Sequence, residues 1–171
     1  MPDDELQRFL KVWDAEAQKT AALLRTLPAG QYDFRPDAGA RSVGELAWHL
    51  AEVEAYISYG IEQGAVGPGS RPPGIERPKS IAALAPEYER VHTEAAARLK
   101  RLAPADLDRK LSDFGGPPRP IRDILWLAML LHQIHHRGQL SVLCRLAGGA
   151  SPGMFGPNRE ETARRRAGAG A

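Results

Sequence analysis

Residues 120–149 read PIRDILWLAMLLHQIHHRGQLSVLCRLAGG, and this stretch decides the fold. It predicts one long helix that opens at Pro120, a residue favoured in the first helical turn, and ends before Gly148 and Gly149. From Ile124 to Leu131 the segment is apolar on nearly every side, which is typical of a helix buried from several directions. The same helix carries three of the five histidines of the chain.

Three further segments have apolar residues at spacings of three and four, as amphipathic helices do. They cover about residues 3–27, 43–63 and 80–102, and the sequence S-x-x-E at Ser42 and Glu45 predicts a capping box for the second of them. The connection 64–79 is rich in Gly and Pro and is expected to be irregular, exposed and mobile, and residues 105–111 are expected to form a short helix. No segment alternates with the period of a strand. The pattern predicts an all-α four-helix bundle with long connections between the helices.

The bulk properties are those of one globular domain. The chain has 171 residues and a formal net charge of +2, so it lacks the basic stripe that nucleic-acid binders usually show. A single cysteine, Cys144, excludes an intrachain disulfide and fits a reducing cytoplasm. The acidic N-terminus does not resemble a signal peptide, and the longest apolar run is too short to cross a bilayer. We therefore expect a cytoplasmic protein with no nucleic-acid and no membrane partner.

The end of the chain differs in composition from the rest. Three consecutive arginines, Arg164 to Arg166, precede the sequence AGAGA. We expect a bundle domain over residues 1–157 and a disordered, solvated basic tail over residues 158–171.

His132 and His136 lie about 40° apart around a helix, one turn above the other. They share the predicted core stripe of the fourth helix, whereas His135 falls on its flank. Two imidazoles at i and i+4 on an inward face are a common half-site for a transition metal. The spacing alone leaves open that these are ordinary hydrogen-bonded histidines. His92 is expected to be a hydrogen-bonded core residue or simply exposed.

His49 lies on the flank of the second predicted helix and could complete the site. Three neutral imidazoles would leave one coordination position open, which is the pattern of catalytic rather than structural zinc. Glu45 and Glu52 lie one turn before and one turn after His49, so they are the candidate general bases, although such residues are often solvated or orient a ligand. Cys144 lies two turns beyond His136 and is expected to be a small core residue.

Two blocks of sequence carry a resemblance to a known family. HQIHHRGQLSVLCRLAGG (132–149), followed by MFGP (154–157), and YDFRPDAGARSVGELAWHLAEVE (32–54) resemble the signature regions of the DinB/YfiT-like family. The resemblance covers about residues 5–157 and is most specific at H-x-x-x-H-R-G-Q. It implies a four-helix bundle with His49, His132 and His136 as ligands of zinc or nickel, and often a homodimer.

The resemblance also bears on activity. Members of the family include thiol-dependent S-transferases and isomerases that use low-molecular-weight thiols such as bacillithiol or mycothiol. It therefore implies a metal-dependent enzyme, of S-transferase or hydrolase chemistry, that acts on a small-molecule substrate. Other members are named damage-inducible and have no known activity, so the alternative is a non-catalytic, stress- or damage-associated metal-binding or interaction protein.

The three residues after His136 also have specific expectations. Gln139 lies close to His132 around the helix and could be a hydrogen-bond partner of a ligand. Arg137 points away from the site, which favours an ion pair or an interface. Gly138 costs about 1 kcal/mol relative to Ala within a helix, which suggests close approach of another segment. Ordinary packing is the alternative for all three.

Overall fold

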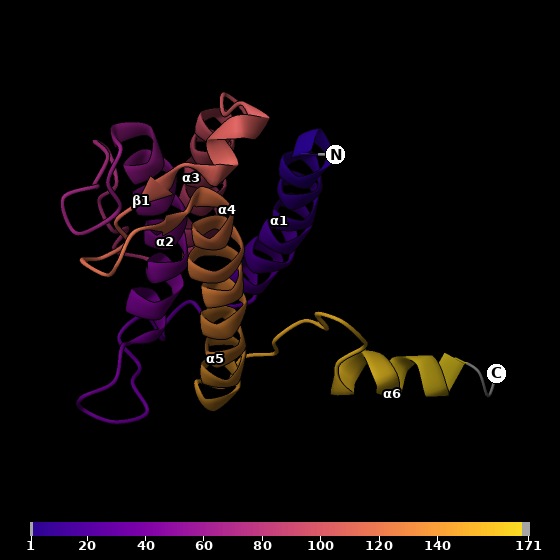
Figure 1. Ribbon diagram of the computed structural model, residues 1–171. Coiled ribbons are helices and arrows are strands. Elements are labelled where there is room, and N and C mark those ends of the chain that lie inside the picture. The colour runs from indigo at the N-terminus through magenta and orange to yellow at the C-terminus, as the bar shows by residue number, and fades with distance from the viewer. Residues whose placement is uncertain (1, 169–171) are drawn as a thin grey trace.

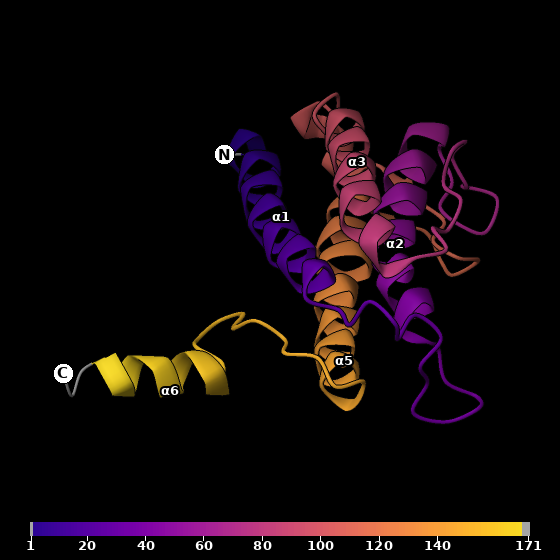
Figure 2. The same ribbon diagram turned by 180° about the vertical axis from the view of Figure 1, so that it is seen from behind.

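The computed structural model describes residues 2–168, in which four long helices lie side by side (Figures 1 and 2). They are α1 (Pro2–Arg25), α2 (Val43–Gln63), α3 (Ile81–Leu99) and a continuous fourth helix built from α4 (Ile121–Asp123), η2 (Ile124–Leu131) and α5 (His132–Leu146). The remaining elements are the short 3-10 helix η1 (Pro104–Asp108), the two-residue strands β1 (Lys110–Leu111) and β2 (Arg119–Pro120), and α6 (Arg159–Gly168). The predicted all-α four-helix bundle is confirmed. No helix within residues 2–168 combines the length and the hydropathy needed to cross a bilayer.

The second helix begins and ends where its sequence signals predict. The hydroxyl of Ser42 accepts a hydrogen bond from the Glu45 amide at 3.2 Å, and the Glu45 carboxylate accepts one from the Ser42 amide at 2.8 Å. Gly64 ends the helix with a φ of 86°, a left-handed conformation that glycine adopts without steric cost. The S-x-x-E capping box is thereby confirmed.

The fourth helix differs from a regular α-helix in its first half. Residues Ile124–Leu131 form a π-helix, and α-helical geometry resumes at His132. Ile124, Leu125, Met129 and Leu130 are buried, as expected for a helix buried on several sides, whereas Leu127 and Leu131 are about half exposed. The apolar run could not reveal the π-helix, because a run of apolar residues fits the period of an α-helix and that of a π-helix equally well. The i, i+4 spacing of His132 and His136 lies wholly within α5 and is retained.

A buried carboxylate connects all four long helices. Glu54 of α2 is fully buried and accepts hydrogen bonds from Tyr88 of α3 and Gln133 of α5, each at 2.6 Å. Gln133 also donates to the Leu50 carbonyl at 3.1 Å and accepts from the Trp13 indole of α1 at 3.2 Å. Because a buried charge without partners is strongly unfavourable, this network fixes how the helices pack.

Gln133→Leu should lower the free energy of unfolding by about 3 kcal/mol, because it removes a donor from the buried Glu54 carboxylate. Urea unfolding followed by circular dichroism would measure this. The matched control, Glu89→Gln, breaks the exposed Arg25–Glu89 ion pair and should cost less than about 1 kcal/mol. Equal losses in the two variants would contradict the role given to the network.

His92 is hydrogen-bonded and mostly buried, the first of the two alternatives expected for it. Its Nδ1 lies 2.8 Å from the Glu54 carboxylate and its Nε2 lies 3.4 Å from that of Asp14. Burial lowers the pKa of His92, but the two carboxylates outweigh this effect and raise the pKa above its usual value of 6.5.

The raised pKa gives His92 a pH-dependent contribution to stability. The folded protein holds the His92 proton more tightly than the unfolded chain, so the stabilisation is complete below pH 6.5 and is lost as pH rises through the folded-state pKa. Urea unfolding of the wild type and of His92→Gln should therefore differ more at pH 6 than at pH 8.5. A difference that grew with pH would contradict this assignment.

The long connections are more ordered than expected. Val66 and Ile75 are buried in the 64–79 connection, and Val66 forms an isolated parallel bridge with Asp113. Strands β1 and β2 form an antiparallel ladder, which the sequence did not predict. The short helix expected over 105–111 is the 3-10 helix η1. Tertiary contacts hold these segments in place, and such contacts leave no periodic pattern in the sequence from which they could be predicted.

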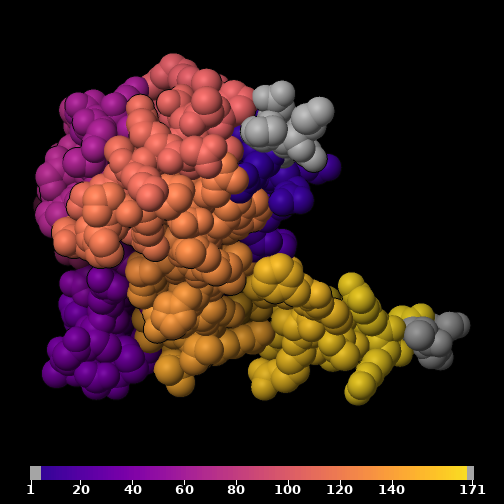
Figure 3. All heavy atoms as spheres, viewed as in Figure 1, coloured from indigo at the N-terminus to yellow at the C-terminus, as the bar shows by residue number. Residues whose placement is uncertain are grey.

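The C-terminal segment also differs from its expectation. Arg159–Gly168 forms α6, which projects away from the bundle (Figures 1 and 3). Asn158 caps it, since its side chain accepts from the Glu161 amide at 2.7 Å. Arg145 of α5 binds both oxygens of Glu160 at 2.7 and 2.8 Å. Arg164 to Arg166 are exposed, as expected, and residues 169–171 of the expected tail lie outside the described residues.

Gly138 does not have the close neighbour that was inferred for it. A Cβ atom built there would meet nothing within 4 Å among the described residues. Val142 and Leu146, on the same helix, are about 60% exposed. Within residues 2–168 this side of α5 is therefore left exposed, and the homodimer implied by the family resemblance stays a prediction.

Candidate metal centre

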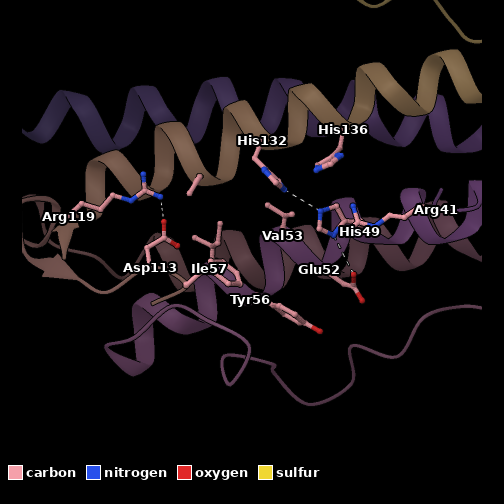
Figure 4. A pocket seen from close by; sticks show the side chains of 12 residues that line it. Arg41, His49, Glu52, Val53, Tyr56, Ile57, Asp113, Arg119, His132 and His136 are labelled. Carbon is pink, nitrogen blue, oxygen red and sulfur yellow. Dashed lines mark hydrogen bonds and ion pairs between the residues drawn. The ribbon is translucent and has the colours of Figure 1, made fainter. Parts of the chain in front are cut away.

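Three histidines converge between α2 and α5. His49 projects from α2, and His132 and His136 project from successive turns of α5 (Figure 4). One ring nitrogen of each lies within 4.8 Å of the others, and the Nε2 atoms of His49 and His132 are 3.2 Å apart. The predicted set of three is thus brought together, whereas His135 is not part of this cluster.

The donor set fits a first-row transition metal. Two nitrogens that each bind zinc at 2.0–2.1 Å in a tetrahedron are separated by about 3.3 Å. The 3.2 Å between His49 and His132 matches that separation. His132 is exposed and His49 and His136 are partly exposed, and all three line a pocket, so a fourth ligand could reach them. These residues could therefore hold a divalent ion with an open position.

The environment keeps two of the imidazoles neutral. Burial lowers the pKa of His132, and the nearby charges of His49, His135 and Arg41 lower it further. Burial, aided by the same kind of repulsion, lowers the pKa of His136 to about 4 even though Gln139 acts in the opposite direction. Neutral imidazole is the form that binds a metal, so these two histidines would not have to lose a proton to bind one near pH 7.

Gln139 orients one of the three histidines. Its Oε1 lies 2.7 Å from Nδ1 of His136, which makes Nδ1 the protonated nitrogen and leaves the lone pair on Nε2. Gln139 therefore contacts a histidine of the cluster, although that histidine is His136 and not His132, and its role beside a metal ligand stays a prediction. Arg137 points to the other side, is buried, and forms an ion pair with Glu16 of α1, as predicted.

The two candidate bases have different surroundings. Glu45 accepts from Ser42 and from both terminal nitrogens of Arg35, at 2.7 and 3.1 Å, and these contacts lower its pKa to about 2. A carboxylate engaged in this way is a poor base, and Glu45 does not line the pocket beside the histidines. Glu52 lines that pocket and lies 3.7 Å from Nδ1 of His49.

The histidines form one end of a pocket of about 500 Å³ (Figure 4). Val53, Ile57 and Ala128 give it an apolar wall, and Asp113 and Arg119 form an ion pair at the other end. The full lining comprises Arg41, His49, Glu52, Val53, Tyr56, Ile57, Asp113, Phe114, Arg119, Ala128, His132 and His136. A pocket of this volume accommodates a small organic molecule.

Comparison with known proteins identifies the family. The family model described as the DinB superfamily matches residues 13–140. The uncharacterized protein YrdA of Bacillus subtilis (strain 168) is 30% identical over 159 residues, which is 93% of each chain. The chain belongs to the DinB superfamily.

Solved structures agree with this membership. A DinB-like protein from Bacillus cereus ATCC 10987 superimposes with a TM-score of 0.70 and 30% sequence identity, and the match covers 86% of this chain and 95% of that one. The DinB-like protein YjoA of Bacillus subtilis also gives a TM-score of 0.70, at 24% identity and with 89% and 99% coverage, and shows the same fold. The DinB resemblance drawn from the sequence is thereby confirmed.

Several pocket residues were missed by sequence reasoning. Asp113, Phe114 and Arg119 belong to the connection between η1 and α4, and only the tertiary fold brings them beside α2. Arg41 immediately precedes the N-cap of α2, where no helical period applies. The only sequence signal for Arg41 was its position within residues 32–54, the segment that resembles the DinB/YfiT-like family.

Proposed function

We propose that this DinB-superfamily protein is a metal-dependent enzyme with a divalent ion, zinc or nickel, bound by His49, His132 and His136. The observation that carries the proposal is the convergence of three ring nitrogens within 4.8 Å of one another, beside a pocket of about 500 Å³. Three protein ligands leave a tetrahedral ion with one position for water, thiol or substrate.

The surroundings of the histidines support a chemical role. A bound divalent ion would lower the pKa of a water or thiol that reaches it and so provide a nucleophile near neutral pH. Neutral imidazoles do not cancel the charge of an ion, so the site would favour anionic ligands. Glu52 lines the pocket and is the candidate base; its carboxylate lies 3.7 Å from Nδ1 of His49, so it would orient that ring only after a small movement. The proposed chemistry is thiol-dependent S-transfer or hydrolysis, with a low-molecular-weight thiol as co-substrate.

Metal analysis tests the site directly. Purified wild-type protein, loaded with Zn²⁺ and freed of excess, should hold one ion per chain, and His132→Ala should weaken binding by more than about 100-fold, since even the loss of a residue that only orients a ligand costs 10–100-fold. The matched control is His135→Ala, which removes a neighbouring histidine outside the cluster and should bind as the wild type does. Full occupancy in His132→Ala would overturn the three-histidine site.

Catalysis needs a separate experiment. Zinc- and nickel-loaded protein would be assayed for thiol transfer to an electrophilic acceptor, with bacillithiol and mycothiol as donors. Turnover is expected with at least one thiol, and Glu52→Gln should retain the metal while lowering kcat about 100-fold. Metal binding without turnover for either thiol would favour the alternative, a non-catalytic, stress- or damage-associated metal-binding or interaction protein.

A further inference from the structure

Arg41 is a cationic side chain at the mouth of the histidine site. It lies in the pocket lining with His49, His132 and His136, and Figure 4 shows it extending toward the ring of His49. Its charge contributes to the lowered pKa of both His132 and His136, which agrees with this proximity. It also lines a second hollow, of about 530 Å³, that shares His136 with the first.

Arg41 differs from the arginines around it in having no partner within residues 2–168. The neighbouring Arg35 and Arg77 both pair with Glu45. At the far end of the pocket, Arg119 pairs with Asp113. Arg41 forms neither a hydrogen bond nor an ion pair with any described residue, so its five N–H donors are free for a ligand.

The rest of the pocket indicates what kind of ligand would suit this arginine. Val53, Ile57 and Ala128 offer an apolar wall, and Tyr56 and Phe114 add aromatic surface. A planar guanidinium matches a carboxylate through two parallel hydrogen bonds. A phosphate, with more oxygens and more charge, usually has several donors around it, and here one arginine stands alone.

We propose that Arg41 binds the carboxylate of the substrate, which is an organic acid with an apolar body that lies along Val53 and Ile57. This arrangement directs the rest of the molecule into the pocket and holds it against the three histidines. The proposal rests on the proposed function for the reaction that follows, but the recognition of the carboxylate by Arg41 does not depend on a bound metal.

The test measures binding of 4-phenylbutyrate and of its neutral amide, 4-phenylbutyramide, to the full chain by calorimetry, with and without one equivalent of Zn²⁺. The wild type should bind the carboxylate more tightly than the amide. Arg41→Gln should weaken carboxylate binding about 10-fold. This is the low end of the range for a hydrogen bond to a charged group, because Arg41 is exposed to solvent. The same variant should leave amide binding within twofold of the wild type.

The matched control is Arg8→Gln, which removes an exposed arginine of α1 that lines neither hollow and should change nothing. Equal affinity of the wild type for acid and amide, or an unchanged carboxylate affinity in Arg41→Gln, would overturn the role of Arg41 even if zinc binds. If the wild type takes up no zinc, the proposed function fails, and the metal-free measurement still decides on Arg41.

Substitutions that fill one hollow or the other test where the apolar part of the ligand lies. Ala128→Phe places a large side chain in the proposed pocket and should weaken acid and amide together by more than about 10-fold, since it excludes the shared phenyl group. Val142→Phe fills the second hollow in the same way and should have no effect. The opposite pattern would overturn the placement of the apolar body along Val53 and Ile57.

Discussion

The buried carboxylate of Glu54 accepts hydrogen bonds from α3 and α5, and its partner Gln133 extends the network to α1. A charge in this position is tolerated only while its donors stay in place, so each helix has one favourable register against α2. The same network sets the geometry of the histidine site. Gln133 is adjacent to His132 in sequence and donates to the carbonyl of Leu50, which is adjacent to His49. One polar contact therefore holds α2 and α5 at the separation at which the imidazoles of His49 and His132 meet.

The two sides of α5 differ in the charge state of their side chains. On the core side, Gln133 and Arg137 are buried and bind acidic groups of α2 and α1. On the pocket side, burial and neighbouring positive charge keep His132 and His136 neutral, and Gln139 fixes the orientation of His136. The structural charges of the bundle are thus separated from the ligands, which leaves the pocket with Arg41 and Glu52 as its unneutralised groups near the histidines. Of these two groups, Arg41 is the one that could bind an anionic group of a ligand.

Much of the fold could be predicted from the sequence, because amphipathic helices have a period and helix ends have signals. The bounds of α2 followed from Ser42, Glu45 and Gly64, and the i, i+4 spacing identified His132 and His136 as a pair. Helical geometry left open whether His49 belongs to the predicted set of ligands, and the resemblance to the family included it. The π-helix at 124–131 could not be predicted, since an apolar run satisfies either period. Glu45 illustrates a conflict within the sequence itself: a residue that completes a capping box cannot also serve readily as a base.

The residues that could not be predicted are those placed by tertiary contacts alone. Asp113, Phe114 and Arg119 reach the pocket because Val66 and the short β1–β2 ladder hold their loop against α2. Glu54 lies directly beside the apolar stripe of α2 in sequence, and nothing local distinguishes it from a solvated glutamate. Its role depends on Tyr88, His92 and Gln133, which come from two other helices.

The account depends most on the three histidines acting as one metal site. A crystal structure of the zinc-loaded protein, with anomalous difference maps recorded on both sides of the zinc absorption edge, tests this directly. The account predicts one strong peak per chain, within about 2.1 Å of a ring nitrogen of each of His49, His132 and His136. A peak elsewhere, for example at Cys144 or beside Glu54 and His92, or no peak at full zinc loading, would contradict it.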